Sequence, residues 1–295
     1  MLNLMKILGT GLTGLIGSRI VELLSDQYQF ENISRSTGVD ITHKDQVKEV
    51  IEKSDADVIL HLAAMTDVKG AELEKDQREE SSSWKINVSG TENIAYACQQ
   101  TEKKLVYLST DLVFKGENPP EKGYEETDQP DPVNWYAKTK YEGELRVQKV
   151  TSPWIIMRPG YPYRANFPKK DFVRVFQSLL EEKKQFTAIV DRIITPTFID
   201  DLALALDGLL KHNATGIYHT TGSESISIYD AAKMVAQTFE LDASLIGKTT
   251  RKEFLVGKPA EPFNSSLCIH KLEQLGIQMH TFQEGLDIIK GQQHV

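Results

Sequence analysis

A tyrosine and a lysine four positions apart, Tyr136 and Lys140, have the clearest chemical use in this chain. On a helix, that interval puts both side chains on one face. A neighbouring ammonium favours tyrosinate, so we expect Lys140 to lower the pKa of Tyr136 and make its phenol a usable general acid for the oxygen of a carbonyl group whose carbon receives hydride. A hydroxyl such as that of Thr110 would hold the same oxygen. On its own, the spacing is more typical of a packed tyrosine beside a solvated lysine.

The element that would bring a cofactor to this pair runs from Lys6 to Leu24 and reads as strand, glycine turn and helix. An apolar run enters the turn, and apolar residues then recur at helical spacing. Gly11 can take backbone angles that a β-carbon forbids, Gly14 lets the main chain approach a pyrophosphate, and Gly17 lets the helix lie close to the strand. The alternatives are a tight turn without a ligand and a secretory signal, and the glycine interruptions disfavour the latter.

The second expected strand, Phe30 to Ile33, ends in a Ser-Arg-Ser sequence where a dinucleotide fold meets the adenosine ribose. An acidic residue there would accept hydrogen bonds from a free 2′-hydroxyl, whereas an arginine flanked by hydroxyls suits a 2′-phosphate. Arg35 therefore favours NADP over NAD, with a solvated loop cation as the alternative. Asp40 and Ile41 would cover the adenine, or Asp40 would cap the helix expected from Lys44 to Lys53.

Two apolar runs, Val58 to Ala64 and Leu105 to Leu108, predict buried parallel strands. His61 lies within the first run, where a lone histidine is more often a satisfied core residue than a catalytic one. The second run ends in a Ser-Thr-Asp sequence that contains Thr110, and polar groups at the carboxyl end of a strand point into the ligand crevice. We therefore expect an α/β protein with a doubly wound parallel (Rossmann) sheet and a smaller C-terminal α/β lobe.

We expect residues 1–160 to form the dinucleotide-binding domain, with 190–215 returning to it, and residues 161–189 and 216–295 to form the substrate-binding lobe. A helix is expected within Thr197 to Leu210. The paired acids Asp200 and Asp201 at its start suit helix capping better than metal binding, so no metal site is predicted.

Composition narrows the class of partner. The net charge of -8 and the lack of a long Lys/Arg block favour neither nucleic acid nor an anionic membrane surface, and no apolar run has the length of a membrane span. The two cysteines, Cys98 and Cys268, can build neither a disulfide framework nor a cysteine-rich metal site, which favours the reduced cytoplasm. A small-molecule site is the expectation that remains.

Several motifs, in their order along the chain, resemble those of the extended short-chain dehydrogenase/reductases, and within that superfamily the dTDP-4-dehydrorhamnose reductases. The resemblance covers nearly the whole chain and is most family-specific at the Ser-Thr-Asp-x-Val-Phe sequence and at Asp191 to Thr197. The motifs are Thr10-Gly11-x-x-Gly14-x-x-Gly17, His61-Leu62-Ala63-Ala64-Met65-Thr66, Asn87-Val88-x-Gly90-Thr91-x-Asn93, Ser109-Thr110-Asp111-x-Val113-Phe114 and Tyr136-x-x-x-Lys140.

The resemblance implies an NAD(P)H-dependent reductase of a nucleotide-linked 4-keto-6-deoxy sugar, with a place in dTDP-rhamnose biosynthesis. Tyr136 would donate the proton, Lys140 would hold the nicotinamide ribose with support from Asn87, and Thr110 would take the place of the usual serine hydroxyl. Asp111 and Tyr161 would approach the sugar. The cofactor is expected to be NADP, with NAD as the alternative, and the residues expected to hold it are Gly11, Leu12, Thr13, Gly14, Leu15, Ile16, Gly17, Ser34, Arg35, Asp40, Ile41, Leu62, Ala63, Ala64, Thr66, Tyr136 and Lys140.

Some positions depart from the family pattern. Leu112 stands where tyrosine is common and Tyr161 where tryptophan is usual, so we expect a different sugar pocket. Two alternatives stay open: a nucleotide-sugar epimerase on the same fold, and a non-catalytic cofactor-binding subunit resembling the regulatory subunit of methionine adenosyltransferase. Many members of the family are dimers, which makes a homodimer a further expectation.

Overall fold

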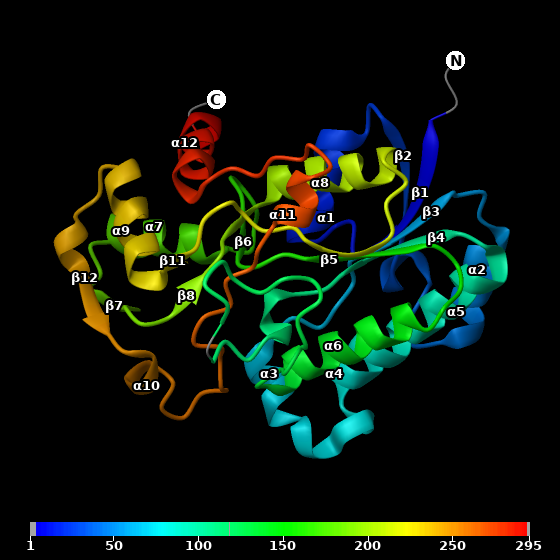
Figure 1. The fold of residues 1–295 in the computed structure, drawn as a ribbon, viewed down its shortest axis with the longest axis horizontal. Coiled ribbons are helices and arrows are strands. Elements are labelled where there is room, and N and C mark those ends of the chain that lie inside the picture. The colour runs from blue at the N-terminus through cyan, green and yellow to red at the C-terminus, as the bar shows by residue number, and fades with distance from the viewer. Residues whose placement is uncertain (1–3, 118, 294–295) are drawn as a thin grey trace.

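A parallel six-stranded sheet forms the centre of the computed structural model, which describes residues 4–117 and 119–293 (Figure 1). The strands lie in the order β10-β5-β4-β3-β1-β2, and every neighbouring pair is parallel. The predicted doubly wound Rossmann sheet is therefore confirmed. Its strands are β1 (Met5–Thr10), β2 (Tyr28–Ile33), β3 (Val58–His61), β4 (Lys104–Leu108), β5 (Trp154–Arg158) and β10 (Gly216–His219).

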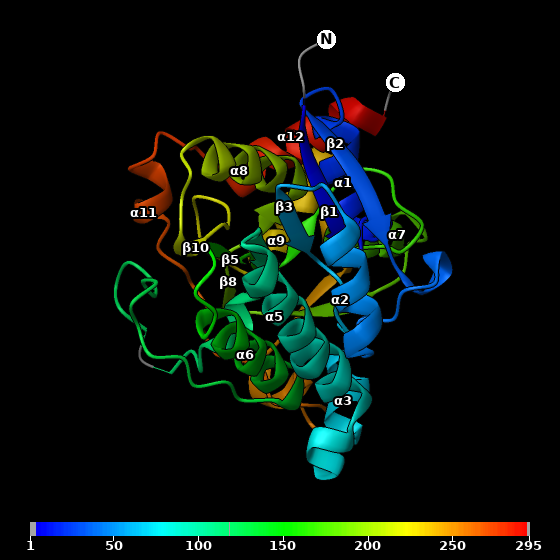
Figure 2. The ribbon, with the colours of Figure 1, turned by 90° about the vertical axis from the view of Figure 1, so that its right-hand side faces the viewer.

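Helices cover both faces of the sheet (Figure 2). One face packs its apolar side chains against α1 (Leu15–Leu24) and α8 (Ile199–Lys211), in a core that includes Ile20 and Leu206. The other face packs against α2 (Lys44–Lys53), α5 (Thr91–Thr101) and α6 (Trp135–Gln148). A parallel sheet buried on both sides explains why the strands read as nearly continuous apolar runs.

Several helices and strands follow the sequence expectations closely, and α2 has the predicted bounds. The strand expected through Ala64 is shorter, because β3 ends at His61 and the following residues leave the sheet to line a cavity. The helical stretch that follows the next polar segment is divided into α4 (Ser82–Trp84), the π-helical turn η3 (Lys85–Gly90) and α5.

The polar segment before α4 also contains α3 (Val68–Leu73) and the 3₁₀ segment η2 (Lys75–Glu80). Arg78 in η2 has a φ of 49°, which interrupts the helical backbone there. Two short 3₁₀ turns follow strands of the central sheet: η1 (Arg35–Thr37) comes after β2, and η4 (Asp111–Val113) comes after β4. These turns carry the chain from the sheet to the ligand edge.

A second group of elements, at the left of Figure 1, contains α7 (Phe172–Glu181), α9 (Ile228–Thr238), β7 (Phe186–Ile189) and β12 (Ile246–Thr249). Tyr163, Phe198 and Phe282 lie in its aromatic core. The remaining short elements are β6 (Pro162–Tyr163), β8 (Ile193–Ile194), β9 (Thr197–Phe198), β11 (Ile226–Ser227), η5 (Ala243–Leu245), α10 (Arg251–Phe254), α11 (His270–Glu273) and α12 (Phe282–Gln293).

The division into two domains stays a prediction, but the sheet changes one of its boundaries. Strand β10 pairs with β5, although residues 216–295 were expected in the lobe. We therefore propose that Gly216–His219 belong with the dinucleotide-binding domain. Among the helices of the described residues, none is long and apolar enough to cross a bilayer.

Candidate active site

The glycine turn joins β1 to α1 and needs glycine at two places for reasons of space. Gly11 has a φ of +73°, and a β-carbon there would lie 2.8 Å from the backbone nitrogen of Ala63. A β-carbon at Gly17 would collide with the carbonyl oxygen of Gly11. Helix α1 begins after Gly14, which has no side chain to cap it, so the first amides of the helix are suited to a phosphate.

A cavity of about 580 Å³ lies between this turn and the carboxyl ends of β3, β4 and β5. Its volume falls within the usual range for ligand pockets. Most of the predicted site residues line it, although they come from distant parts of the chain. They are Gly11, Gly14, Leu15, Ile16, Gly17, Leu62, Ala63, Ala64, Thr66, Thr110, Asp111, Tyr136, Lys140 and Tyr161.

Three predicted cofactor residues lie outside this cavity because their side chains face elsewhere. Leu12 and Ile41 are 5% and 8% exposed and pack in the cores on opposite faces of the sheet. Thr13 is exposed at the turn.

The other three predicted cofactor residues outside the cavity, Ser34, Arg35 and Asp40, lie beyond the carboxyl end of β2. The Nε of Arg35 donates to Oδ2 of Asp40 at 2.9 Å, and the backbone amide of Thr42 donates to Asp40 at 2.9 Å. These bonds lower the pKa of Asp40, with that of the Thr42 amide first. Asp40 thus orients Arg35 at the place where a 2′-phosphate is expected.

Tyr136 and Lys140 both lie on α6, as predicted, and both face the same cavity. The helix is fixed at its start by Asn134, whose side chain accepts from the amide of Ala137 at 2.9 Å and donates to the carbonyl of Ala260 at 2.9 Å. Tyr136 is 8% exposed and Lys140 is 2% exposed. The two groups are therefore held in place with little contact with solvent.

The electrostatic relation between the pair differs from the expectation. Burial lowers the pKa of Lys140 to about 7, against the opposing charge of Glu144. Burial, and then the charge of Asp111, raise the pKa of Tyr136, while a hydrogen bond with Thr110 acts in the opposite direction. The prediction that Lys140 lowers the pKa of Tyr136 is wrong for this arrangement, because a lysine with a pKa of about 7 is already neutral over the pH range in which a tyrosine loses its proton.

Asp111 is the second buried ionisable group beside Tyr136. Its Oδ2 accepts from the hydroxyl of Ser265 at 2.7 Å and its Oδ1 accepts from that of Thr110 at 3.2 Å. Burial raises the pKa of Asp111, whereas these bonds and the charge of Arg192 lower it. The carboxyl group of Asp111, the hydroxyl of Thr110 and the phenol of Tyr136 thus form one polar wall of the cavity, and Ser265 supports the carboxyl group from behind it.

Several cavity residues were not predicted. Arg192 forms an ion pair with Glu261 and lies 5.2 Å from the ring centre of Tyr161. Tyr161 itself has a φ of 45°. Arg192 stands in the family-specific Asp191 to Thr197 stretch, which was the available signal, whereas Glu261 follows in a proline-containing tail with no motif. The cavity is also lined by Phe167, Lys169 and Lys170, and no motif in the sequence indicated these three residues.

His61 and Asn87 have supporting positions. His61 is fully buried and hydrogen-bonds Thr10 at 2.7 Å and Thr91 at 3.1 Å, which confirms the interpretation as a satisfied core residue. Asn87 donates to the hydroxyl of Thr139 at 2.9 Å and exchanges two hydrogen bonds with the backbone of Met65. Asn87 therefore holds α6 beside Lys140 instead of bonding to Lys140 itself.

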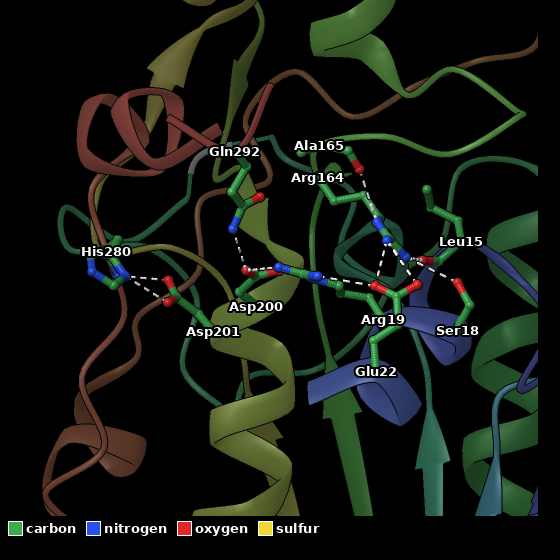
Figure 3. A network of polar contacts seen from close by, with 10 residues as sticks. All are labelled: Leu15, Ser18, Arg19, Glu22, Arg164, Ala165, Asp200, Asp201, His280 and Gln292. Atoms are coloured by element: carbon green, nitrogen blue, oxygen red, sulfur yellow. Dashed lines mark hydrogen bonds and ion pairs between the residues drawn. The ribbon is translucent and has the colours of Figure 1, made fainter. Parts of the chain in front are cut away.

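The paired acids at the start of α8 do not cap it, so that prediction is wrong (Figure 3). Asp200 binds the guanidinium of Arg19 at 2.7 and 2.6 Å, and Asp201 binds the ring and amide of His280 at 2.6 and 2.7 Å. Within residues 4–117 and 119–293, no group of three or more His, Cys, Asp or Glu side chains could hold a metal ion.

A parallel Rossmann sheet whose cavity joins a glycine turn to a Tyr-x-x-x-Lys pair defines an NAD(P)-dependent protein of the extended short-chain dehydrogenase/reductase class. Residues 5–292 match the family described as RmlD substrate binding domain, and the chain belongs to this family.

Individual relatives match along almost the whole chain. The dTDP-4-dehydrorhamnose reductase of Aggregatibacter actinomycetemcomitans is 31% identical, over 97% of this chain and 98% of its own length. The crystal structure of dTDP-4-dehydrorhamnose reductase from Bacillus anthracis in complex with NADP has a TM-score of 0.89 at 30% identity, covering 98% of this chain and 99% of that one. The methionine adenosyltransferase 2 subunit beta of Xenopus laevis is 29% identical, over 94% of this chain and 84% of its own.

Proposed function

We propose that this chain reduces the C4 ketone of a nucleotide-linked 4-keto-6-deoxy sugar with NADPH. The coarser class, an NAD(P)-dependent reductase of a nucleotide-linked sugar, follows from the family. The observation that carries the finer proposal is that Thr110, Tyr136 and Lys140 line one cavity with the glycine turn. Gly11 and Gly17 let the turn pack closely against neighbouring backbone at the edge of this cavity, where a dinucleotide would bind, and the reduced nicotinamide, when bound, supplies the hydride.

The proton would come from Tyr136. Its raised pKa keeps the phenol protonated at neutral pH, the state that a proton donor requires. Thr110, which hydrogen-bonds the phenol, would hold the same substrate oxygen. Lys140 would hold the nicotinamide ribose, and Arg35 would bind the 2′-phosphate that distinguishes NADP from NAD.

The sugar would lie against Asp111 and Tyr161. The carboxyl group of Asp111 is an acceptor for sugar hydroxyls, and Arg192 beside Tyr161 adds a buried cation to the same wall. Leu112 also lines the cavity, so an apolar side chain stands where the family commonly has a tyrosine. We therefore assign the reaction class and leave the particular sugar to experiment.

A second candidate is a cofactor-binding regulatory subunit, which the 29% identity to methionine adenosyltransferase 2 subunit beta supports. The presence of Thr110, Tyr136 and Lys140 in one cavity favours catalysis. A sugar-nucleotide epimerase would use the same groups without net consumption of reduced cofactor. The family supports a homodimer, and the two free cysteines, Cys98 and Cys268, support a reducing compartment.

The test is oxidation of NADPH and NADH, followed by absorbance, with dTDP-4-keto-6-deoxy-L-mannose. Wild type, Tyr136→Phe and Tyr141→Phe are compared, since Tyr141 lies on the same helix with its hydroxyl on Gln129. We expect turnover in wild type and Tyr141→Phe and a loss of about 10²–10⁴-fold in Tyr136→Phe. Binding of NADP⁺ without turnover of any keto-sugar would favour the regulatory subunit, and turnover without net oxidation would favour the epimerase.

A further inference from the structure

The segment from Tyr161 to Lys170 forms one side of the cavity, although it lies outside the central sheet. Tyr161, Phe167 and Lys170 are among its cavity-lining residues. Two buried arginines hold the segment, Arg164 at 5% exposure and Arg174 at 8%. The burial of two guanidinium groups beside one short segment requires that their donors be satisfied, so their partners identify what holds the segment in place.

Arg164 connects the segment to α1 (Figure 3). Its Nη2 donates to both carboxylate oxygens of Glu22, at 2.8 and 3.1 Å. Its Nη1 donates to the hydroxyl of Ser18 at 3.0 Å and to the carbonyl of Leu15 at 3.4 Å, and its Nε donates to the carbonyl of Ala165 at 3.0 Å. The guanidinium is thus fully engaged, and all but one of these bonds cross to α1.

Helix α1 is also the helix that begins at the glycine turn. Leu15, whose carbonyl accepts from Arg164, lines the cavity in the first turn of α1. Farther along the helix, Arg19 binds Asp200 of α8, and Asp200 in turn accepts from Gln292 of α12 at 3.1 Å. The body of α1 is therefore fixed without Arg164. Arg164 ties the cavity segment, which β6 also pairs with β9, to the beginning of α1.

Arg174 holds the same segment in a different way. Its Nη2 donates to the carbonyl of Lys169 at 2.7 Å, its Nη1 to the carbonyl of Phe167, and its Nε to Asp171 at 2.8 Å. All of these partners lie within a few residues of Arg174 along the chain. Arg174 therefore shapes the segment, whereas Arg164 attaches it to α1.

We propose that Arg164 is a positioning residue that couples the binding of the nicotinamide cofactor at the glycine turn to the placement of segment 161–170. The proposal rests on the proposed function in one respect, that the cofactor binds at this turn. A pyrophosphate that immobilises the first turn of α1 also immobilises the Leu15 carbonyl and the Ser18 hydroxyl that Arg164 requires. By linkage, the segment held in this position increases the affinity for the cofactor by the same factor.

The first experiment is amide hydrogen exchange of segment 161–170 with and without NADP⁺, in wild type, Arg164→Lys and Arg174→Lys. In wild type we expect NADP⁺ to slow exchange about tenfold. Arg164→Lys should lose most of this protection while NADP⁺ still binds, because an ammonium cannot reproduce the planar set of donors. Arg174→Lys should exchange faster in both states but keep the protection ratio.

The outcomes separate the coupling from the proposed function. The coupling is overturned if Arg164→Lys binds NADP⁺ and keeps the wild-type protection ratio. It is also overturned if wild type binds NADP⁺ and the segment gains no protection. Either result leaves the proposed function intact. Absence of NADP⁺ binding in wild type overturns both. Protection that depends on Arg164 in a protein that reduces no keto-sugar supports the coupling and contradicts the proposed function.

Two further readouts guard against a merely structural effect. Glu22→Gln removes the charge partner of Arg164 from a half-exposed position, while Asp200 still holds Arg19, so this variant is expected to fold and to lose part of the protection. In the reductase assay, Arg164→Lys should raise KM for the sugar nucleotide about tenfold with little change in kcat, because it changes placement and not the reacting groups. A tenfold fall in kcat with KM unchanged would contradict a positioning role.

Discussion

The ammonium nitrogen of Lys140 lies 2.7 Å from the carbonyl oxygen of Leu108, to which it donates a hydrogen bond. This partner carries no full charge, and the ring of Tyr107, 4.2 Å away, is uncharged as well. Burial therefore dominates, and the pKa of Lys140 falls to about 7.

The first prediction concerns the stability of the cofactor-free protein. The pKa of Lys140 is about 7 when folded and 10.5 as its ordinary value, so between these pH values the unfolded chain binds more protons. Wild-type stability should then rise with pH by up to ~1.4 kcal/mol per pH unit relative to Lys140→Met. Below pH 7 Lys140 is protonated in both the folded and the unfolded chain. The free energy of unfolding of Lys140→Met should then exceed that of wild type by its largest amount.

Urea unfolding from pH 6 to pH 10 measures this margin. Lys138→Met, which removes an exposed lysine from the same helix, is the control. A margin between Lys140→Met and wild type that stays constant with pH would show that Lys140 keeps its ordinary pKa.

The second prediction concerns the hydroxyl of Thr110, which bonds Asp111 and Tyr136 and accepts from the amide of Leu112. Thr110→Val should lower turnover by about 10²–10³-fold, because it removes the group that holds the substrate oxygen. Thr110→Ser keeps the hydroxyl and should retain most of the activity. Steady-state kinetics of the two variants compares the hydroxyl with the methyl group, and equal losses would exclude a role for the hydroxyl.

A third prediction addresses the buried ion pair of Arg158 and Glu144, one turn beyond Lys140 on α6. The two side chains meet through two hydrogen bonds of 2.9 and 2.6 Å and are 1% and 0% exposed. Glu144→Gln should destabilise the fold by about 3–5 kcal/mol, since it leaves an uncompensated buried charge. The double variant with Arg158→Met should recover part of that loss in urea unfolding, and simple addition of the two losses would refute the coupling.

Gly11 and Gly38 provide a matched pair for the fourth prediction. Both have a positive φ, of 73° and 86°, so alanine at either position carries a backbone cost of ~1 kcal/mol. Only at Gly11 would the new β-carbon strike backbone, at Ala63, whereas Gly38 has open space. We expect Gly11→Ala to lose NADP⁺ binding in calorimetric titration and Gly38→Ala to retain it. Similar binding by both variants would remove the steric argument.

The fifth prediction concerns cofactor preference. Arg35, oriented by Asp40, should bind the 2′-phosphate, so Arg35→Ala should weaken NADPH binding about tenfold or more and leave NADH binding unchanged. Lys53→Ala, at the far end of α2, controls for a general loss of positive charge. If NADPH and NADH affinities fall together, Arg35 does not read the 2′-phosphate.

The parts of this fold that depend on neighbouring residues were predictable from the sequence. The strand, turn and helix around Gly11 follow from local periodicity, and the shared face of Tyr136 and Lys140 follows from helical spacing. Ligands bind at the carboxyl ends of parallel strands, and this rule correctly predicted that Thr110 and Asp111 line the same cavity as the glycine turn.

The parts that depend on distant partners were not predictable in this way. From the residues next to it in the sequence, Asp200 resembles a helix-capping residue. Its actual partner, Arg19, lies 181 residues earlier in the chain. The pKa of Lys140 depends on burial, which spacing does not report. Strand β10 reads as a short apolar segment of the later chain, and only its pairing with β5 places it in the central sheet.

That pairing has a consequence for synthesis on the ribosome. Arg158 of β5 and its neighbour His219 of β10 are 61 residues apart, so β5 emerges well before the strand that covers its outer edge. At ~5–20 residues per second, the nascent sheet would keep an apolar strand with an unpaired edge for about 3–12 seconds. Such an edge is a template for pairing with other chains, so newly made protein can aggregate through β5 during this interval.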